Sequence, residues 1–221
     1  MFEPFTDKHG IGNLRFHFAT QEAVDWYYPL KPYTLLEYEW IKANVRTYRA
    51  KVIDAGSHHG NYSVLFGGHR GLFCVDANPQ NCDITELNLK LNGIPGEVIN
   101  CAVWGYDGEV LFSGASNGQV GYGYPVRACK LSTICQFAEI VKLDVEGSEF
   151  SILPAAIDEM GLVHTWIVEV HPAQGDPHAL MMEFVNRGWE VLKVDRDIMG
   201  VVPYAESMPW TTHATIIARR K

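Results

Sequence analysis

Early in the chain the sequence reads Val52-Ile53-Asp54-Ala55-Gly56-Ser57-His58-His59-Gly60-Asn61-Tyr62. Val52 and Ile53 suit a buried strand, and Gly56 and Gly60 lack the Cβ that would prevent close approach of the backbone. A helix that begins near Gly60 would direct its first amide N–H groups at a ligand. The spacing Gly-x-x-x-Gly matches neither the dinucleotide fingerprint Gly-x-Gly-x-x-Gly nor a phosphate loop. The stretch therefore predicts a different kind of nucleotide-binding turn, or a tight turn with no ligand.

The composition is that of one ordinary globular unit. The chain has 221 residues, of which 47% are hydrophobic and 20% are charged. This length and hydrophobic content are sufficient for a full core but not for two full domains. We expect an N-terminal extension and helix over residues 1–50 and one main domain over residues 51–221.

The charge and the cysteines restrict the partners and the compartment. The formal net charge of -8 argues against a nucleic-acid partner, because the phosphate backbone favours a basic face. No apolar run reaches the length of a membrane span, and the N-terminus does not resemble a secretion signal, so we expect no membrane partner and a cytoplasmic location. The five cysteines form no Cys-x-x-Cys pair and are expected to be small hydrophobic residues instead of a disulfide framework.

Strands and helices alternate along most of the chain. After the first strand and helix, predicted strands cover residues 71–76, 97–103, 110–112, 140–147, 165–171, 189–194 and 214–218, and an edge strand is expected at 14–18. Predicted helices cover residues 34–45, 83–91, 149–156 and 178–187. This alternation indicates an α/β fold with a mainly parallel sheet.

Several of these strands end on an acidic or imidazole side chain, namely Asp54, Asp76, Asp144 and His171. In a doubly wound sheet, ligands bind outside the carboxyl ends of the strands, where the strand order reverses. Asp76 follows the first turn by roughly 20 residues, the spacing of a carboxylate that accepts both hydroxyls of a ribose. The acidic groups and the missing central glycine disfavour a pyrophosphate. They favour a nucleoside that carries a sulfonium cation, and S-adenosylmethionine is such a ligand.

Four segments carry a more specific pattern, namely residues 52–63, residues 75–79, Val141-Lys142-Leu143-Asp144-Val145-Glu146-Gly147-Ser148-Glu149 and Ile167-Val168-Glu169-Val170-His171. Together they resemble the successive motifs of FkbM-family methyltransferases over residues 51–219. The resemblance implies a Rossmann-like class I methyltransferase fold, with a seven-stranded, mainly parallel sheet and an antiparallel last strand. It also implies an S-adenosylmethionine cofactor and, usually, transfer to an oxygen of a small molecule or sugar. The chain departs from the family at Ser57-His58, where Ala-Asn is frequent, and at Ser132, where Asp is usual.

The resemblance also assigns cofactor contacts to individual residues. Asp54, Gly56 and Gly60 would line the methionine and sulfonium end, with Tyr62 at its border, and Asp76 would hold the ribose. The segment 100–102 would pass the adenine. The full cofactor set implied in this way is Asp54, Gly56, Ser57, Gly60, Tyr62, Asp76, Ala77, Cys101, Ala102 and Asp144.

The catalytic set expected beside the cofactor is His171, Asp144 and Glu169. His171 is the candidate base, because an imidazole with a pKa near 6.5 can accept a proton around neutrality. Glu169 could orient His171 or stabilise its cation, and Asp144 would orient the cofactor or the acceptor. A histidine that only caps the strand before Pro172 is equally consistent with the pattern.

The neighbouring charges allow a second interpretation. Lys142 is expected to pair with Glu146 or Glu169, since a buried lysine needs a partner. The favoured interpretation assigns no metal. The alternative is a Mg²⁺ or Mn²⁺ site made of Asp144, Glu146, Glu169 and His171.

We therefore predict an S-adenosylmethionine-dependent methyltransferase that O-methylates a small-molecule or carbohydrate-like acceptor. Acceptor choice is expected from the irregular segments 1–32, 113–124 and 195–210, whose aromatic residues also suit a homodimer contact. An NAD(P)-dependent oxidoreductase is the enzymatic alternative, and the absent Gly-x-Gly-x-x-Gly opposes it. The third hypothesis is a non-catalytic methyltransferase-like scaffold. His58 and His59, beside the cofactor turn, have no assigned role.

Overall fold

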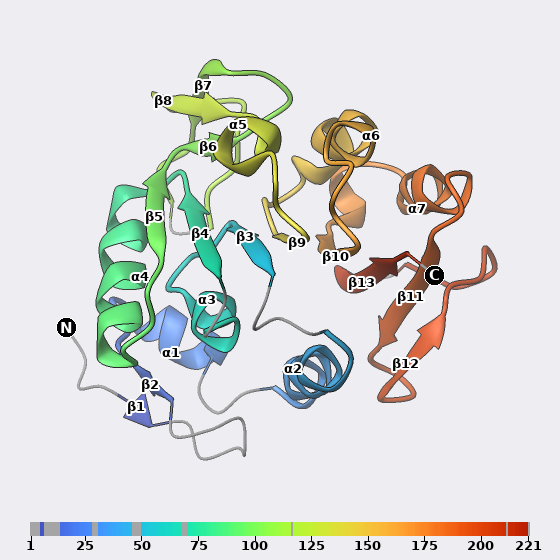
Figure 1. The fold of residues 1–221 in the computed structure, drawn as a ribbon, viewed down its shortest axis with the longest axis horizontal. Coiled ribbons are helices and arrows are strands. Elements are labelled where there is room, and N and C mark those ends of the chain that lie inside the picture. Colours follow the sequence, from blue (N-terminus) through green and yellow to red (C-terminus); the bar gives the residue numbers. More distant parts are fainter. Residues whose placement is uncertain are drawn as a thin grey trace.

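An eight-stranded sheet forms the centre of the molecule (Figure 1). The computed structural model describes residues 5–6, 14–27, 31–45, 50–67, 70–115, 117–210 and 212–220 of the chain. In spatial order the strands are β12 (Gly200–Pro203), β11 (Glu190–Asp195), β13 (Ala214–Arg219), β10 (Thr165–Val170), β9 (Ile140–Leu143), β3 (Lys51–Ala55), β4 (Gly71–Asp76) and β5 (Glu97–Asn100).

The sheet is mainly parallel, as the sequence predicts. The neighbouring pairs β5–β4, β4–β3, β3–β9 and β9–β10 are parallel, and β13 is antiparallel to both β10 and β11. The expected seven strands are present, but an eighth, β12, pairs antiparallel with β11 at the edge. This strand forms within the segment 195–210 that the sequence predicts to be irregular. Asp195 closes the intervening turn by accepting hydrogen bonds from the amides of Asp197 and Ile198.

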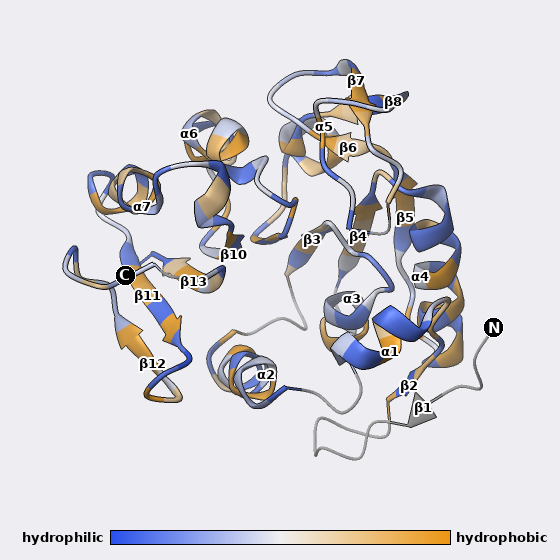
Figure 2. Cartoon of the chain, turned by 180° about the vertical axis from the view of Figure 1, so that it is seen from behind, coloured by the Kyte–Doolittle hydropathy of each residue, from blue (hydrophilic) through white to orange (hydrophobic). Residues whose placement is uncertain are grey.

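Helices cover both faces of the sheet. One face carries α5 (Leu131–Cys135), α6 (Glu149–Glu159) and α7 (Pro177–Val185), and the other carries α2 (Pro32–Asn44), α3 (Asn61–Leu65) and α4 (Pro79–Leu91). Because strand side chains alternate, β3 places Ile53 and Ala55 in the first core and Val52 in the second. Hydrophobic and hydrophilic positions mix along α6 and α7, as expected for helices with one face on a sheet (Figure 2).

The helix that follows β4 begins at a cap that also fixes the end of the strand. The Asn78 side chain accepts a hydrogen bond from the Gln80 amide at 2.9 Å, and Pro79 occupies the first helical position, where its missing N–H has no cost. The Asn78 amide in turn donates to the Asp76 carboxylate. Asp76 is thereby held at the junction of strand and helix.

The third predicted strand, residues 97–103, is divided in the structure. Its first part is β5 and its last part is β6 (Ala102–Val103), which belongs to a separate three-stranded sheet with β7 (Gly108–Phe112) and β8 (Tyr124–Cys129). The sequence does not predict β8, because Tyr124 stands at the end of a stretch dominated by Gly, Ser and Asn. The segment 113–124 connects β7 to β8.

Two predicted strands end earlier than expected. β9 stops at Leu143 and β10 stops at Val170, before a short 3-10 helix at Pro172–Gln174. The chain after β9 turns sharply, with φ of 51° at Glu146 and 105° at Gly147. The predicted strand over 140–147 is therefore wrong in its second half, and of Lys142, Asp144 and Glu146 only Lys142 lies in β9.

The N-terminal segment packs on the same core as the sheet. α1 (Gln21–Tyr27) contributes Ala23 and Val24 to the second core. The expected edge strand at 14–18 is the two-residue β2 (Arg15–Phe16), which pairs with β1 (Phe5–Thr6) outside the main sheet. The chain start, on which the prediction about a secretion signal depends, lies outside the described residues. None of the described helices is long and apolar enough to cross a membrane.

Candidate active site

A cleft of about 460 Å³ opens at the carboxyl ends of β3, β4, β9 and β10. This is where the strand order reverses, between β3 and β9, and where the sequence predicts a ligand. Ten of the predicted site residues line the cleft: Gly56, Ser57, Tyr62, Asp76, Ala77, Cys101, Ala102, Asp144, Glu169 and His171. Each of the three segments predicted to select the acceptor also contributes lining residues, among them Trp26, Val120 and Arg196.

The turn after β3 presses against the chain that follows β9. Gly56 has φ of 75°, and its amide donates to the Val75 carbonyl at 2.8 Å. A Cβ at this position would lie 1.6 Å from the Asp144 carbonyl oxygen. Glycine is therefore required here for two reasons, the left-handed backbone and the close approach.

Two predicted cofactor residues, Asp54 and Gly60, do not belong to the lining of the cleft. Asp54 is fully buried and accepts a hydrogen bond from the Ser63 hydroxyl of α3. Burial raises the pKa of its carboxyl. Gly60 caps α3 in a left-handed conformation and packs against Thr85. In the structure both residues therefore hold the turn after β3 in place through contacts outside the cleft.

Asp76 lies in the cleft with much of its hydrogen-bonding capacity already used. Its Oδ1 accepts from the Asn78 amide at 2.8 Å and from the Asn81 side chain at 3.1 Å, and its Oδ2 accepts from the His58 amide at 2.9 Å. A carboxylate offers about four lone-pair positions, so one remains on Oδ2. The expectation that Asp76 accepts both hydroxyls of a ribose must therefore be reduced to one. Burial raises the pKa of Asp76 to about 7.

Among the described residues that line the cleft, some have buried polar atoms with no hydrogen-bond partner. They include the hydroxyl oxygen of Ser57 and the side-chain nitrogen of Asn61, both contributed by the turn after β3 and the start of α3. Buried polar groups are normally paired, so unpaired ones in a cleft indicate a ligand. The sequence analysis missed Asn61, although its place directly after Gly60, in the first turn of α3, could have identified it.

The end of the cleft beyond Asp76 is apolar. Its lining here includes Ala77, Cys101, Ala102 and Val103, with Phe112 from β7 opposite. Cys101 is a free thiol and is buried like the other four cysteines, which confirms their prediction as small hydrophobic residues. Asn100 is turned away, because its side chain donates to the carbonyls of Asp76 and Ala77.

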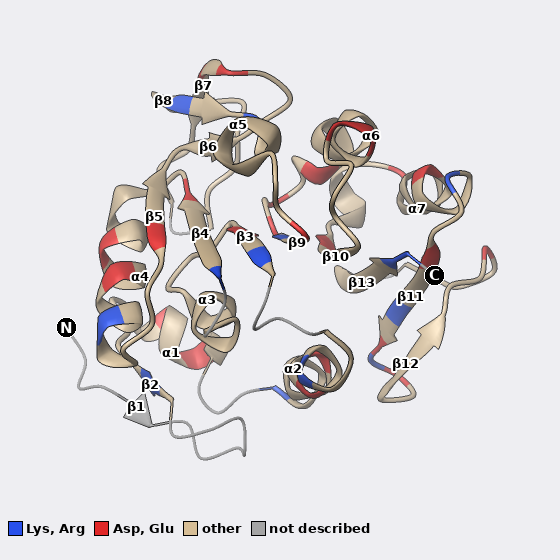
Figure 3. Ribbon diagram, in the orientation of Figure 1, with Lys and Arg blue, Asp and Glu red and all other residues tan. Residues whose placement is uncertain are grey.

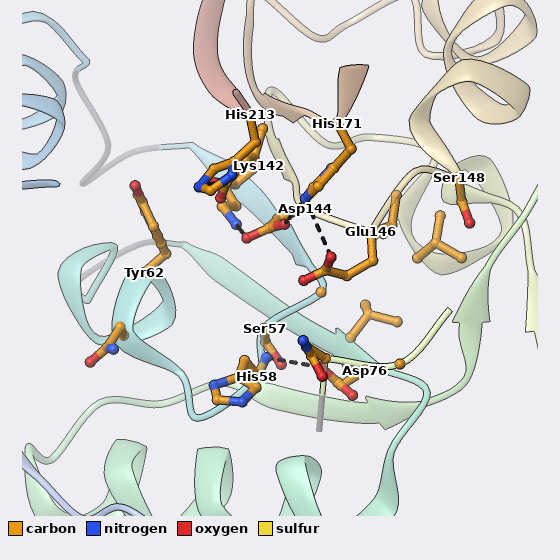
Figure 4. Close-up of a pocket in the computed structure, with 18 of the residues that line it drawn as sticks. Ser57, His58, Tyr62, Asp76, Lys142, Asp144, Glu146, Ser148, His171 and His213 are labelled. Carbon is orange, nitrogen blue, oxygen red and sulfur yellow. Dashed lines mark hydrogen bonds and ion pairs between the residues drawn. The ribbon is translucent and has the colours of Figure 1, made fainter. Parts of the chain in front are cut away.

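The cleft also has a charged part, where Lys142 and Asp144 lie side by side near His171 and His213 (Figure 4). Lys142 is 3% exposed and its ammonium is 2.7 Å from Oδ2 of Asp144, so its partner is neither Glu146 nor Glu169 as predicted. Although burial alone would raise the pKa of Asp144, the Lys142 ammonium lowers it below its ordinary value. Lys142 also lies 4.7 Å from the centre of the Tyr62 ring, and the Tyr62 hydroxyl donates to Glu37.

His171 faces three carboxyl groups. Its Nδ1 is 3.1 Å from Oε1 of Glu149, and its Nε2 is 3.4 Å from Oε2 of Glu146 and 3.9 Å from Oδ1 of Asp144. Burial opposes the charged imidazole, but Glu149 and the two other carboxylates outweigh it and raise the pKa of His171. Glu169 was expected to orient His171. It instead lies 3.3 Å from Nε2 of His213.

His58 and His59 have a definite place in the turn after β3. Their rings stack with centroids 4.1 Å apart, and Nδ1 of His58 is 3.2 Å from the Tyr27 hydroxyl of α1. Burial lowers the pKa of His58 to about 3 and that of His59 to about 4, so both rings are neutral near pH 7. Of the two, only His58 is among the residues that line the cleft.

Comparison with known proteins shows the fold. Neither a family model nor a curated protein matches the sequence. Among solved structures, an rRNA methylase from Streptococcus thermophilus matches with a TM-score of 0.51 and 12% identity over 87% of this chain and 98% of its own. The magnesium protoporphyrin IX methyltransferase from Synechocystis PCC 6803, with bound SAM, matches with a TM-score of 0.53 and 12% identity over 86% and 79%. The chain has the Rossmann-like fold of these methyltransferases.

Another neighbour with this fold is the precorrin-6y C5,15-methyltransferase from Geobacter metallireducens, with a TM-score of 0.50 and 12% identity over 85% of this chain and 89% of its own. The three neighbours are named for methylation of an rRNA, of magnesium protoporphyrin IX and of a precorrin. An identity of 12% carries the fold alone and not the acceptor.

Proposed function

We propose that the chain is an S-adenosylmethionine-dependent methyltransferase of the FkbM group that its motifs resemble. The unpaired Ser57 hydroxyl and Asn61 amide nitrogen in the cleft carry this proposal. A ligand that fills the cleft must supply hydrogen-bonding groups there, because leaving a buried polar group unpaired costs about 1–3 kcal/mol. The amino and carboxylate groups of a methionine moiety meet that need.

The rest of the cleft fits the same cofactor. The remaining lone pair of Asp76 suits one ribose hydroxyl, and the apolar end from Ala77 to Val103 suits an adenine ring. The charged end is rich in carboxylates, as Figure 3 shows for the loop after β9 and the start of α6. Carboxylates favour a positively charged sulfur nearby.

The bound cofactor supplies a methyl group on that sulfur. The chain has to hold an acceptor atom in line with it, and such alignment provides much of the rate of a reaction of this kind. For a hydroxyl acceptor, the new O–C bond forms as the C–S electron pair returns to sulfur and the hydroxyl proton leaves. The predicted role of His171 as the base for that proton stays a prediction, since its Nε2 faces Glu146 and Asp144.

The acceptor is proposed to be a small, hydroxyl-rich molecule methylated on oxygen. The lining beside the charged end offers many hydrogen-bonding side chains, among them Tyr33, Thr34, Glu37, Arg196 and His213. Such a set suits several hydroxyls more than an apolar ring system. An RNA acceptor is the competing outcome of a substrate screen, and the net charge of -8 weighs against it.

Calorimetry with S-adenosylhomocysteine tests the cofactor. The native chain should bind it, and Ser57→Ala should weaken binding roughly 3- to 10-fold, the value of one net hydrogen bond. Ser57→Ala should not lower the free energy of unfolding, since the hydroxyl has no described partner to lose. Ser132→Ala is the matched control, because it removes an exposed hydroxyl that is bonded to Glu159, and it should leave binding of S-adenosylhomocysteine unchanged. Binding of NADH in place of S-adenosylhomocysteine would refute the proposal.

A further inference from the structure

We infer that Asp144, Glu146 and His171 form a binding site for one divalent cation of the Mn²⁺ type at the acceptor end of the cleft. Their candidate ligand atoms lie within 4.8 Å of one another. Nε2 of His171 lies 3.4 Å from Oε2 of Glu146 and 3.9 Å from Oδ1 of Asp144. Two bonds of about 2.1 Å to one ion span distances up to roughly 4.2 Å, so both pairs fit a shared cation.

The imidazole of His171 is oriented toward the cation site by Glu149, a carboxylate that is not one of the three proposed ligands. Glu149 is fully buried, and its Oε1 faces Nδ1 of His171 at 3.1 Å while also accepting the His171 amide at 2.8 Å. A proton on Nδ1 leaves the Nε2 lone pair directed at Glu146 and Asp144. A carboxylate behind a histidine in this way is the usual support of a metal-binding imidazole.

The two carboxylate ligands are also held for the site. Lys142 occupies Oδ2 of Asp144, which leaves Oδ1, the oxygen nearer to Nε2 of His171. Glu146 lies in the left-handed backbone region, with φ of 51°, a conformation that costs a non-glycine residue about 1 kcal/mol or more. The oxygen of Glu149 that is not used by His171 accepts the Gly147 amide at 2.9 Å and so fixes the loop that carries Glu146.

The composition of the set indicates the class of ion. Two carboxylate oxygens and one imidazole suit Mn²⁺ better than Ca²⁺ or Mg²⁺, which prefer oxygen ligands throughout. Glu169, part of the metal alternative that the sequence allowed, is outside the cluster and pairs with His213. Three protein ligands leave coordination positions open, and in the proposed methyltransferase these would take an oxygen of the acceptor. This last step rests on the proposed function, whereas the cation site stands on its own geometry. With its Nε2 on the cation and a proton on Nδ1, His171 would be a ligand and not the predicted base.

A Mn²⁺ titration followed by electron paramagnetic resonance tests the site on the chelator-treated full chain. We expect one Mn²⁺ per chain and at least 10-fold weaker binding in Glu146→Gln. Binding should be weakened roughly 10- to 100-fold in Glu149→Gln, which alters the support of His171 and of the loop that carries Glu146 but removes no ligand of the cation. Glu37→Gln is the matched control, because it removes a carboxyl group that lines the same cleft, lies outside the set and bonds Tyr62 and Thr215 instead of a ligand of the cation. It should leave Mn²⁺ affinity within about 2-fold of the native value.

Two results would overturn the inference. One is a native chain that binds no Mn²⁺ at millimolar concentration. The other is equal weakening by Glu146→Gln and Glu37→Gln, which would indicate general attraction of cations to an acidic cleft. Circular dichroism of each variant excludes loss of fold as the cause. Calorimetry with S-adenosylhomocysteine in the presence of chelator is a separate readout, so failure of the cation site and failure of the proposed function are distinguishable.

Discussion

Replacing Gly56 with alanine should be far more damaging than the same replacement at Gly93. Both glycines have left-handed backbones, with φ of 75° and 65°. At Gly93 an added Cβ meets nothing within 4 Å, so Gly93→Ala should cost only the conformational term of about 1 kcal/mol. At Gly56 the Cβ would lie 1.6 Å from the Asp144 carbonyl oxygen, a distance that no real Cβ contact reaches. The turn after β3 and the chain after β9 must then separate.

That separation adds two further costs. Forcing atoms into a packed site costs about 1–3 kcal/mol, and the hydrogen bonds from the Gly56 amide to Val75 and from the Asp144 amide to Ala55 are worth about 1 kcal/mol each when weakened. We therefore expect Gly56→Ala to lower the free energy of unfolding by about 4–6 kcal/mol, measured by urea titration with fluorescence detection. A loss within about 0.5 kcal/mol of that for Gly93→Ala would refute the steric argument.

Lys142→Met should lower the free energy of unfolding by about 3 kcal/mol, because it leaves the Asp144 carboxylate without its ion-pair partner. Lys90→Met removes an exposed pair with Glu86 and should change the free energy of unfolding by less than about 0.5 kcal/mol. Equal losses for the two variants in urea titrations would contradict this. His58 and His59 have folded pKa values of about 3 and about 4, below the value near 6.5 expected when unfolded. The unfolded chain therefore takes up protons that the folded chain does not, and each histidine should reduce stability by up to roughly 2 kcal/mol as the pH falls from 6.5 to 5. The double variant His58→Gln, His59→Gln should lose less stability than the native chain over this range, and parallel curves for the two proteins would contradict the assignment.

The sequence predicts most of the sheet because burial on both faces leaves a continuous apolar signal. β3, β4 and β10 were located within a residue or two from such runs, and their order along the chain indicates the α/β class. β8 and β12 were missed because few of their side chains are buried, so their sequences lack a continuous apolar run.

The polar residues at the strand ends were also predicted from the sequence. Parallel strands bring their carboxyl ends to one edge of the sheet, so Asp54, Asp76, Asp144 and His171 were predicted to converge. The last three line the cleft, whereas Asp54 does not. What the sequence determined by itself was therefore the fold class, the edge of the sheet that carries the cleft and the types of side chain gathered there.

The tertiary structure decided how those side chains are paired. Lys142 turned out to hold Asp144, and His171 turned out to be oriented by Glu149, because the chain after β9 leaves the strand at Leu143 and turns through Glu146 and Gly147. A period-two pattern cannot show where a strand ends. Hydrogen bonds and ion pairs extend only a few ångströms, so the partner of each charged group depends on distances that exist only once the loops are folded.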